Sequence, residues 1–205
     1  MTEMEKARAG LEFIRGDAQL RAIRERAEGL CFRLNHTSPE KEEERRKILH
    51  ELIPDQGENC FIKPPFFCDY GEFIILGNRF FANYGCKLVD GGTIRFGDDV
   101  LVGPGCTFVT VNHAVEPERR LKGVMQCKPI TVGHNVWFGA EVTVCPGVTI
   151  GDNCVIGAGS VVAGKIPDWQ IWAGNPARYI RDVSEEERGE ISKLYEMLEK
   201  NKSEV

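Results

Sequence analysis

The chain has 205 residues, 42% of them hydrophobic and 28% charged, and its formal net charge is -5 at pH 7. This composition is typical of a folded globular protein, and an acidic chain without a basic stripe is not expected to bind nucleic acid. The first ten residues lack the apolar core of a signal peptide, and no stretch approaches the roughly 18 apolar residues of a membrane span. We therefore expect a cytoplasmic protein that does not bind membranes.

The amino-terminal segment, residues 1–58, is predicted to be helical. Its pattern indicates one helix over Glu3–Phe13, a second over Ala18–Leu34 and a third that begins at Ser38. Ser38 is a good N-cap, and Pro39 is a good first helical residue. The apolar positions near the end of the segment form its expected docking edge: Ile48, Leu49, Leu52 and Ile53.

Residues 59–183 carry a six-residue repeat. An aliphatic or aromatic residue returns at every sixth position at Val132, Phe138, Val144, Ile150, Ile156 and Val162. A strand repeats every ~2 residues and a helix every ~3.6, so this period predicts short strands joined by tight corners, a parallel β-helix. Each repeat residue should stack on its counterpart about 4.8 Å away in the next coil, and a following glycine should permit the corner.

The repeat has two faults. Its early phase, from Cys60 through Tyr70 to Leu88, slips by two residues at the turn-forming sequence 90–92. Phe108 and Val132 are then separated by 24 residues, or four repeats, so residues 114–128 should protrude as a loop while the register of the coil is kept. A long loop within a repeat array usually carries function.

Residues 184–205 are predicted to form a last amphipathic helix. Ser184 and Glu187 have the spacing of a capping box, and apolar residues recur on one side of the stretch that follows: Ile191, Leu194, Tyr195 and Leu198. Helices at the two ends of the chain can cap the repeat array.

The chain contains eight cysteines, none of them in a C-x-x-C pair, and the nearest two are eight residues apart. In a cytoplasmic protein this spacing predicts reduced thiols. Cys86, Cys106 and Cys154 fall where a small hydrophobic residue would pack between coils.

Several short motifs occur together in one order along the chain. They are Pro64-Pro65-Phe66, Phe81-Ala82-Asn83, Asn112-His113, the stretch from Pro129 to Trp137, Gly157-Ala158-Gly159-Ser160 and the stretch from Ala173 to Arg178. With these motifs, the chain from about Arg8 to Arg181 resembles the maltose and galactoside O-acetyltransferases, a branch of the hexapeptide-repeat acyltransferases.

This resemblance implies a mainly β fold, a left-handed parallel β-helix with an N-terminal α-helical appendage and a C-terminal helix. It also implies acetyl-CoA as the acetyl donor, a small hydroxyl compound such as a sugar as the acceptor, and no metal. The implied assembly is a homotrimer with active sites between neighbouring subunits, and a closed cyclic assembly is physically reasonable.

Acetyl transfer from a thioester to a hydroxyl needs a base, and neutral imidazole suits that role at cellular pH. Of the four histidines, His113 lies where the coil breaks into the long loop. Its position alone is equally compatible with a polar residue that ends a strand. The resemblance implies that His113 is the catalytic base.

The resemblance also implies the binding residues. On the acceptor side these are Asn83, Asp69, Asp90 and Met125. On the donor side they are Trp137, Gly139, Ala140, Ala158, Lys165, Arg178 and Arg181, with the Ala140 N–H as the oxyanion donor. Without the resemblance, Asn83 is equally compatible with a corner residue, Met125 with packing, Trp137 with a buried wall and both arginines with solvated surface.

Two positions depart from the family pattern. Where family members commonly have a sugar-binding Asp in the helical segment, this chain has Arg15, with Asp17 nearby, and where a second acidic residue is usual it has Gly91. A carboxylate accepts hydrogen bonds from vicinal sugar hydroxyls, so its loss leaves the acceptor open. A non-sugar hydroxyl compound, such as an antibiotic or an amino acid, is therefore the alternative acceptor.

Two other classes of function also remain open. A β-helical metalloenzyme similar to the γ-class carbonic anhydrases needs three imidazoles around one zinc, whereas only His113 and His134 lie in the helical coil region. A non-catalytic scaffold is the other class, because a fold alone does not prove activity.

Overall fold

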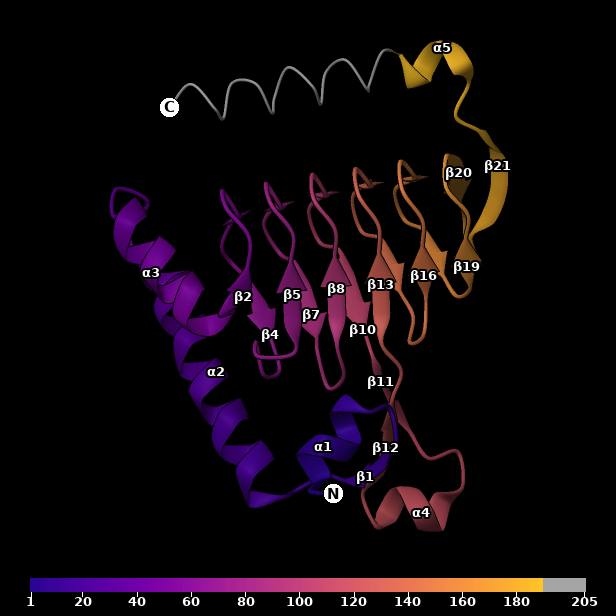
Figure 1. Ribbon diagram of the computed structural model, residues 1–205. Coiled ribbons are helices and arrows are strands. Elements are labelled where there is room, and N and C mark those ends of the chain that lie inside the picture. Colours follow the sequence, from indigo (N-terminus) through magenta and orange to yellow (C-terminus); the bar gives the residue numbers. More distant parts are fainter. Residues whose placement is uncertain (190–205) are drawn as a thin grey trace.

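The computed structural model describes residues 1–189, and most of them are wound into a parallel β-helix (Figure 1). The predicted mainly β fold class is confirmed. Three parallel sheets form the faces of the coil. The first face has six strands, one from each coil: β2 (Asp55–Gln56), β5 (Ile74–Leu76), β8 (Ile94–Phe96), β13 (Ile130–Val132), β16 (Thr149–Ile150) and β19 (Lys165–Ile166).

The second and third faces complete each coil. The second face contains β3 (Phe61–Ile62), β6 (Phe81–Ala82), β9 (Leu101–Val102), β14 (Trp137–Phe138), β17 (Val155–Ile156), β20 (Gln170–Ala173) and the antiparallel β21 (Arg178–Asp182). The third face contains β4 (Phe67–Cys68), β7 (Lys87–Val89), β10 (Thr107–Val109), β15 (Thr143–Val144) and β18 (Val161–Val162).

A stack of aromatic rings runs along the axis of the coil. Phe80, Phe96, Phe108 and Phe138 are buried, and successive ring centroids are 4.8, 5.0 and 5.1 Å apart. The three pairs are tilted or edge-to-face, which is the arrangement that the ring quadrupole favours. These rings come from different faces and fill the axis, whereas the predicted stacking of repeat residues on their counterparts is confirmed by the strand register, in which Val132 pairs with Phe96 and with Ile150.

The glycine that follows a repeat residue is needed for close approach between coils. A Cβ atom on Gly97 would lie 2.7 Å from the carbonyl carbon of Gly133, a separation that real Cβ atoms do not show. The left-handed backbone that turns this corner falls two residues after the glycine, at Asn135 (φ 53°) and Asn153 (φ 58°). Asn enters this region more easily than most residues. Glycine therefore permits the corner, as expected, by allowing close stacking, while the Asn two residues later adopts the left-handed backbone of the turn.

The register of the coil slips twice. β4 pairs with β7 through Cys68 and Leu88, and β5 pairs with β8 through Leu76 and Phe96. Eight residues instead of six therefore separate Cys68 from Leu76, just as they separate Leu88 from Phe96. The slip at residues 90–92 is confirmed, but the assignment of Tyr70 to the repeat is wrong. Tyr70 lies in the first of these longer corners and is buried outside the coil.

Asp90 holds these two corners together. Its side chain is fully buried, one carboxylate oxygen accepts the N–H groups of Asp69 (2.8 Å) and Tyr70 (2.9 Å), and the other accepts the N–H of Gly71 (2.8 Å). These three bonds satisfy backbone donors that the extra residues leave outside the strand ladder. Withdrawal from water nevertheless raises the pKa of Asp90 to about 6, because burial outweighs the three donors.

The helical segment begins with a shorter helix than predicted. α1 (Glu3–Arg8) ends before Gly10, whose φ is 71°, and residues that were expected to continue it form β1 (Glu12–Ile14). The pairing of β1 with β12 (Val124–Cys127), far away in the sequence, is what overrides the helical pattern. The predicted helix over Ala18–Leu34 is confirmed as α2 (Ala18–His36).

The third helix, α3 (Glu42–Leu52), begins after the predicted start at Ser38. Residues 38–41 instead form a turn in which the Lys41 N–H donates to the Ser38 oxygen at 3.0 Å. Glu42, Glu43 and Glu44 then occupy the first turn, where negative charge is favourable. The predicted docking edge is confirmed, because all four of its residues are buried in the main core: Ile48, Leu49, Leu52 and Ile53.

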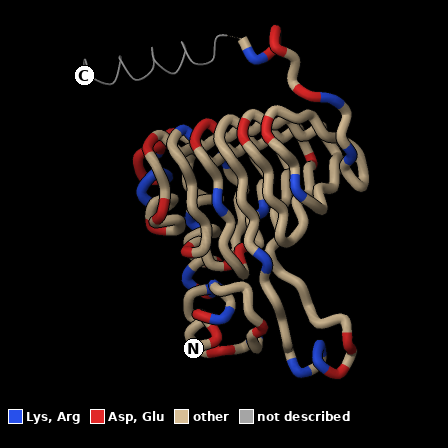
Figure 2. The backbone as a smooth tube through the Cα atoms, turned by 45° about the vertical axis from the view of Figure 1, so that its right-hand side comes forward, with Lys and Arg blue, Asp and Glu red and all other residues tan. Residues whose placement is uncertain are grey.

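Residues 111–127, which we call the arm, project from the third face after β10 (Figures 1 and 2). The arm contains β11 (Val111–His113), α4 (Pro117–Leu121) and β12, and the three-stranded order β1-β12-β11 forms the arm sheet. The protrusion is confirmed, but it is an ordered hairpin and not an irregular loop. Coil register is kept across it, because Phe96 pairs with Val132.

The C-terminal end of the coil is closed by β20 and β21. The Ser160 hydroxyl is buried and accepts the Gly174 N–H at 3.1 Å, which joins the closing segment to the last coils. The predicted capping box is confirmed in α5 (Glu185–Arg188), where Ser184 and Glu187 exchange backbone bonds. The apolar positions expected after it, from Ile191 to Leu198, lie outside the described residues.

All eight cysteines are free thiols. Cys86, Cys106 and Cys154 are buried, as predicted, and the Cys106 thiol donates to the Gly139 oxygen at 3.1 Å. Burial raises the pKa of all three thiols. In residues 1–189, none of the helices combines the length and apolar character needed to cross a membrane.

We predict that Asp90→Asn lowers the free energy of unfolding by about 1–3 kcal/mol at about pH 4, since an amide NH2 group would then face a backbone donor. Urea unfolding at a series of pH values tests the direction in which the contribution of Asp90 changes with pH. Because the folded pKa is raised, the contribution of Asp90 is complete below about pH 4 and is lost as the pH rises through about 6. The difference between wild type and Asp90→Asn should follow this course, whereas the exposed control Asp182→Asn should show neither effect.

Candidate active site

The arm sheet fixes the position of His113. Phe13, Met125 and His113 lie opposite one another in register across β1, β12 and β11, so their side chains share one face of this sheet. Phe13 and Met125 are buried, whereas His113 is exposed. The imidazole makes no hydrogen bond or ion pair with any residue of the described chain. His113 therefore presents an unpartnered imidazole on an ordered strand of the arm sheet.

Two arginines brace the arm. Arg120 donates to the backbone oxygens of Ala114 (3.0 Å) and Val115 (2.9 Å), immediately after His113. Arg119 pairs with Glu12 of β1 at 2.5 Å. Sequence reasoning did not find this role for either arginine. The Arg119–Glu12 pair joins segments that only the arm sheet brings together, whereas Arg120 bonds to residues five and six positions earlier in the arm. The braces hold the strand that carries His113 in place.

The cluster beneath the arm sheet connects His113 to the helical segment. Met125 packs with Phe13, Leu20, Tyr70 and Phe73, among other residues. Arg24 of α2 lies over the Tyr70 ring and donates to its hydroxyl at 2.6 Å. Met125, implied on the acceptor side, is thus a buried neighbour of His113 on the arm sheet, and no motif pointed to the Tyr70–Arg24 pair beneath it.

The two acidic residues implied on the acceptor side differ in environment. Asp69 is half-buried, and burial raises the pKa of its carboxyl while the nearby Arg24 opposes that shift. Asp90 is fully buried, and both of its oxygens are bound to backbone N–H groups. Its geometry corrects the expectation that Asp90 contacts the acceptor, because its role is to hold the corners.

Gly91 has no room for a side chain. A Cβ atom there would lie 2.5 Å from Val111 Cγ2 and 2.8 Å from Cys127 Sγ, both at the root of the arm. Asp17 does not supply the missing carboxylate either, because it caps α2 by accepting the N–H groups of Gln19 (3.0 Å) and Leu20 (3.1 Å). The Gly91 departure is therefore built into the packing, and Asp17 does not compensate for the Arg15 departure.

Asn83 lies at the corner between the second and third faces. In the same corner of later coils stand Gly139, Ala140 and Ala158. The Gly139 N–H is used within the coil, where it donates to the Ile156 oxygen at 2.8 Å. The N–H groups of Ala140 and Ala158, in contrast, have no hydrogen-bond partner within residues 1–189. This corner therefore presents two free backbone donors.

The remaining residues implied on the donor side lie near the C-terminal end of the coil. Trp137 is 55% exposed on the second face, which contradicts the alternative of a buried wall in this chain. Lys165 and Arg178 border one small hollow of about 80 Å³. Arg181 does not join them, because both of its terminal nitrogens pair with Glu187, at 2.5 and 2.8 Å.

The two sets of residues lie at opposite edges of the third face. Asn83, Ala140 and Ala158 occupy the edge toward the second face, whereas His113 lies beyond the other edge, on the arm. The strands of the third face separate the two edges. A single chain therefore does not bring Asn83 next to His113.

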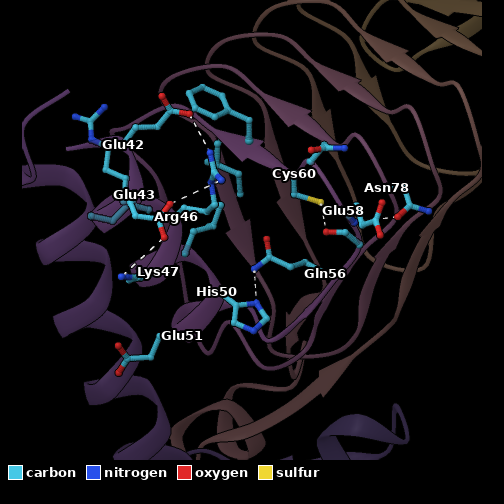
Figure 3. A pocket seen from close by; sticks show the side chains of 17 residues that line it. Glu42, Glu43, Arg46, Lys47, His50, Glu51, Gln56, Glu58, Cys60 and Asn78 are labelled. Carbon is cyan, nitrogen blue, oxygen red and sulfur yellow. Dashed lines mark hydrogen bonds and ion pairs between the residues drawn. The ribbon is translucent and has the colours of Figure 1, made fainter. Parts of the chain in front are cut away.

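A larger hollow, of about 940 Å³, lies between α3 and the first coil (Figure 3). Its charged walls are largely paired with one another, as Arg46 is with Glu42 (3.2 Å) and Glu43 (3.8 Å). His50 faces Gln56 across it at 3.4 Å. None of the predicted site residues lines this hollow, so its size alone does not make it the active site.

Comparison with known proteins decides the family. Two family models match the chain, the bacterial transferase hexapeptide (six repeats) over residues 129–164 and the maltose acetyltransferase hexapeptide capping motif over residues 6–57. The galactoside O-acetyltransferase of Escherichia coli strain K12 is 39% identical over 197 residues, which are 96% of this chain and 97% of that protein. The chain belongs to the maltose and galactoside O-acetyltransferase family.

Solved structures agree with this membership. A galactoside acetyltransferase in complex with coenzyme A superposes with a TM-score of 0.88 at 40% identity, covering 92% of this chain and 94% of that one. A maltose O-acetyltransferase from Clostridium difficile 630 also has a TM-score of 0.88, at 38% identity, covering 90% of this chain and 99% of that one. The predicted resemblance is confirmed, and with it the class of acyltransferases.

The described residues of this O-acetyltransferase do not form the zinc site that the carbonic-anhydrase alternative needs. Within residues 1–189, no three His, Cys, Asp or Glu side chains come close enough together to hold a metal ion. His134, the other histidine in the coil, accepts the Asp98 N–H through Nδ1 at 3.0 Å. That bond gives His134 a structural role at a corner.

For this acetyltransferase we predict that Gly91→Ala lowers the free energy of unfolding by about 1–3 kcal/mol, because the new methyl group collides with Val111 and Cys127. Urea unfolding measures the loss. The matched control is Gly164→Ala, where a Cβ atom meets nothing within 4 Å. Adding Val111→Ala should recover part of the loss, and equal midpoints for Gly91→Ala and Gly164→Ala would contradict the collision.

Proposed function

We propose that this protein is an acetyl-CoA-dependent O-acetyltransferase that transfers an acetyl group directly to a hydroxyl of a sugar, with His113 as general base. The observation that carries the proposal is the exposed, unpartnered imidazole of His113 on the braced arm sheet. The relatives add support, since they include a galactoside O-acetyltransferase and a galactoside acetyltransferase bound to coenzyme A.

The reaction is a single displacement at the thioester carbonyl. The neutral imidazole of His113 takes the proton of the acceptor hydroxyl as its oxygen attacks the acetyl carbon. The Ala140 N–H, free within the described chain, stabilises the negative charge that forms on the carbonyl oxygen. When the intermediate collapses, the C–S bond breaks and the imidazolium returns its proton to the departing thiolate.

The donor would lie along the corner that holds Ala140 and Ala158, whose free N–H groups suit the carbonyl and amide oxygens of the pantetheine arm. Trp137, exposed beside this corner, offers an apolar surface. Lys165 and Arg178 border one hollow near the end of the coil and have the charge to meet phosphates. Arg181 would contribute only if it left Glu187, so we give it a lesser role.

We propose a homotrimer whose active sites lie between subunits. Asn83 and the free donors stand at one edge of the third face and His113 stands beyond the other, so two copies are needed to complete a site. The second face carries a matching apolar stripe, in which Phe61, Leu101 and Trp137 are 42%, 49% and 55% exposed. Such a stripe is typical of a surface that another subunit covers.

On the acceptor side we propose Met125 as a wall and Asn83 and Asp69 as polar contacts. The alternative acceptor is a non-sugar hydroxyl compound, favoured by Arg15 and Gly91. A panel of acceptors followed by release of free coenzyme A thiol separates the two. We also propose a cytoplasmic location, which the eight unpaired thiols favour.

We predict that His113→Ala lowers kcat by about 10²- to 10⁴-fold, because the hydroxyl proton loses its acceptor. The measurement is thiol release with the wild-type acceptor, and calorimetry should find coenzyme A binding unchanged. His134→Ala is the matched control and should keep near-wild-type turnover. Retained turnover in His113→Ala would disprove the base, and a wild-type chain that binds no coenzyme A would favour the scaffold.

Mixed oligomers test the shared site. His113→Ala and Asn83→Ala should each be inactive alone. If each site takes His113 from one subunit and Asn83 from the next, refolding an equal mixture should restore about one quarter of wild-type activity, because one site in four receives both intact residues. Mixing the folded variants without unfolding is the control. Activity that stays at the level of the single variants would place both residues of a site in one chain.

A further inference from the structure

Arg15 stands on the same face of the arm sheet as His113. It directly follows β1, and its backbone N–H donates to the Gly123 oxygen at 3.0 Å, so Arg15 continues the register of β1 opposite Gly123. The row two residues away contains Phe13, Met125 and His113. Residues two apart on a strand share a face, and so Arg15 belongs to the face that carries the imidazole.

Gly123 allows the arginine to lie across β12. A Cβ atom on Gly123 would be 3.0 Å from Arg15 Cγ and 3.5 Å from Arg15 Nε, so the arginine stem occupies the place of the missing side chain. Gly123 is buried although Arg15 is exposed, which fits a glycine that the stem covers. Diagonal neighbours on adjacent strands are about 7–8 Å apart, so this long side chain reaches across β12, the strand between β1 and β11. The guanidinium is therefore directed from β1 toward the strand of His113.

Arg15 has no internal partner for its charge. Its guanidinium makes no hydrogen bond or ion pair with any of residues 1–189. The carboxylates near it in sequence are already engaged, Glu12 with Arg119 and Asp17 with the first turn of α2. At the root of the arm, Asp90 is buried and Gly91 has no charge. The positive charge of Arg15 is thus available to a ligand.

Asp69 makes no side-chain hydrogen bond or ion pair within residues 1–189, but its carboxylate faces another cation, Arg24. Asp69 lies close enough to Arg24 for that guanidinium to oppose the rise in its pKa, whose main cause is burial. Arg24 in turn is held by the hydroxyl of Tyr70. Asp69 is therefore balanced by Arg24, and the charge of Arg15 remains unpaired on the face that carries His113.

We infer that Arg15 selects acceptors that carry an anionic group, a carboxylate or a phosphate, close to the hydroxyl that is acetylated. The inference rests on the proposed role of His113, which receives the hydroxyl while Arg15 receives the anion. A guanidinium binds either anion through two parallel N–H donors. A neutral acceptor makes no such pair and gains nothing from Arg15.

Matched acceptors test the inference with the full-length enzyme and saturating acetyl-CoA. One pair is a carboxyethyl glycoside and the propyl glycoside of the same sugar, which have the same ring hydroxyls, and the other is a sugar 1-phosphate and the free sugar. Thiol release should give the wild type a kcat/KM about 10- to 100-fold higher for the charged member of a pair. The pair with the larger ratio identifies carboxylate or phosphate as the anion.

Substitutions then assign the preference to Arg15. Arg15→Gln should remove it, mainly through a higher KM for the charged acceptor, and leave the KM for acetyl-CoA and the turnover of neutral acceptors unchanged. Arg15→Lys should restore part of it. The control is Arg95→Gln, at an exposed position on the first face, and it should behave as wild type.

The outcomes are distinguishable from a failure of the proposed function. If the wild type acetylates neutral members as well as or better than charged ones, or if Arg15→Gln keeps the preference, the inference about Arg15 is wrong while the proposed function stands. If no acceptor of either kind releases thiol, the proposed function itself is wrong.

Discussion

The fixed spacing between successive coils is the constraint on which the rest of this structure depends. Parallel strands hydrogen-bond at about 4.8 Å, so every coil must present the same inward residue at the same place as its neighbours. The register of Phe96, Val132 and Ile150 meets this requirement on the first face, and Gly97 against Gly133 meets it at a corner. A coil of this kind tolerates extra residues only where they leave the ladder.

The functional residues lie where extra residues do leave the ladder. Two additional residues in each of two corners are held by the buried carboxylate of Asp90, and the arm projects between β10 and β13 without disturbing the register on either side. Because β1 joins the arm hairpin as a third strand, His113 stands on an ordered sheet. The same sheet places Arg15 beside it, so the helical segment contributes directly to the proposed acceptor site.

The regular part of the coil has a different role. Its repeated corners leave the N–H groups of Ala140 and Ala158 free in a row, which suits an extended donor, while its second face leaves Leu101 and Trp137 exposed. Donor and acceptor residues therefore occupy separate edges of one subunit. This division is the physical reason for proposing that a second copy of the chain completes each site.

The sequence by itself determined the β-helix, the helix over residues 18–34, the protrusion and the residue types of the proposed chemistry, because each depends on a local period or motif. It did not determine that Glu12–Ile14 would be a strand, that Tyr70 would leave the repeat, or that Asp90 would be buried, since these depend on pairing and burial between distant segments. The tertiary structure alone decided that Arg15 lies over Gly123 on the face of His113. A long side chain is placed by what it packs against, and in this protein that partner lies more than one hundred residues away.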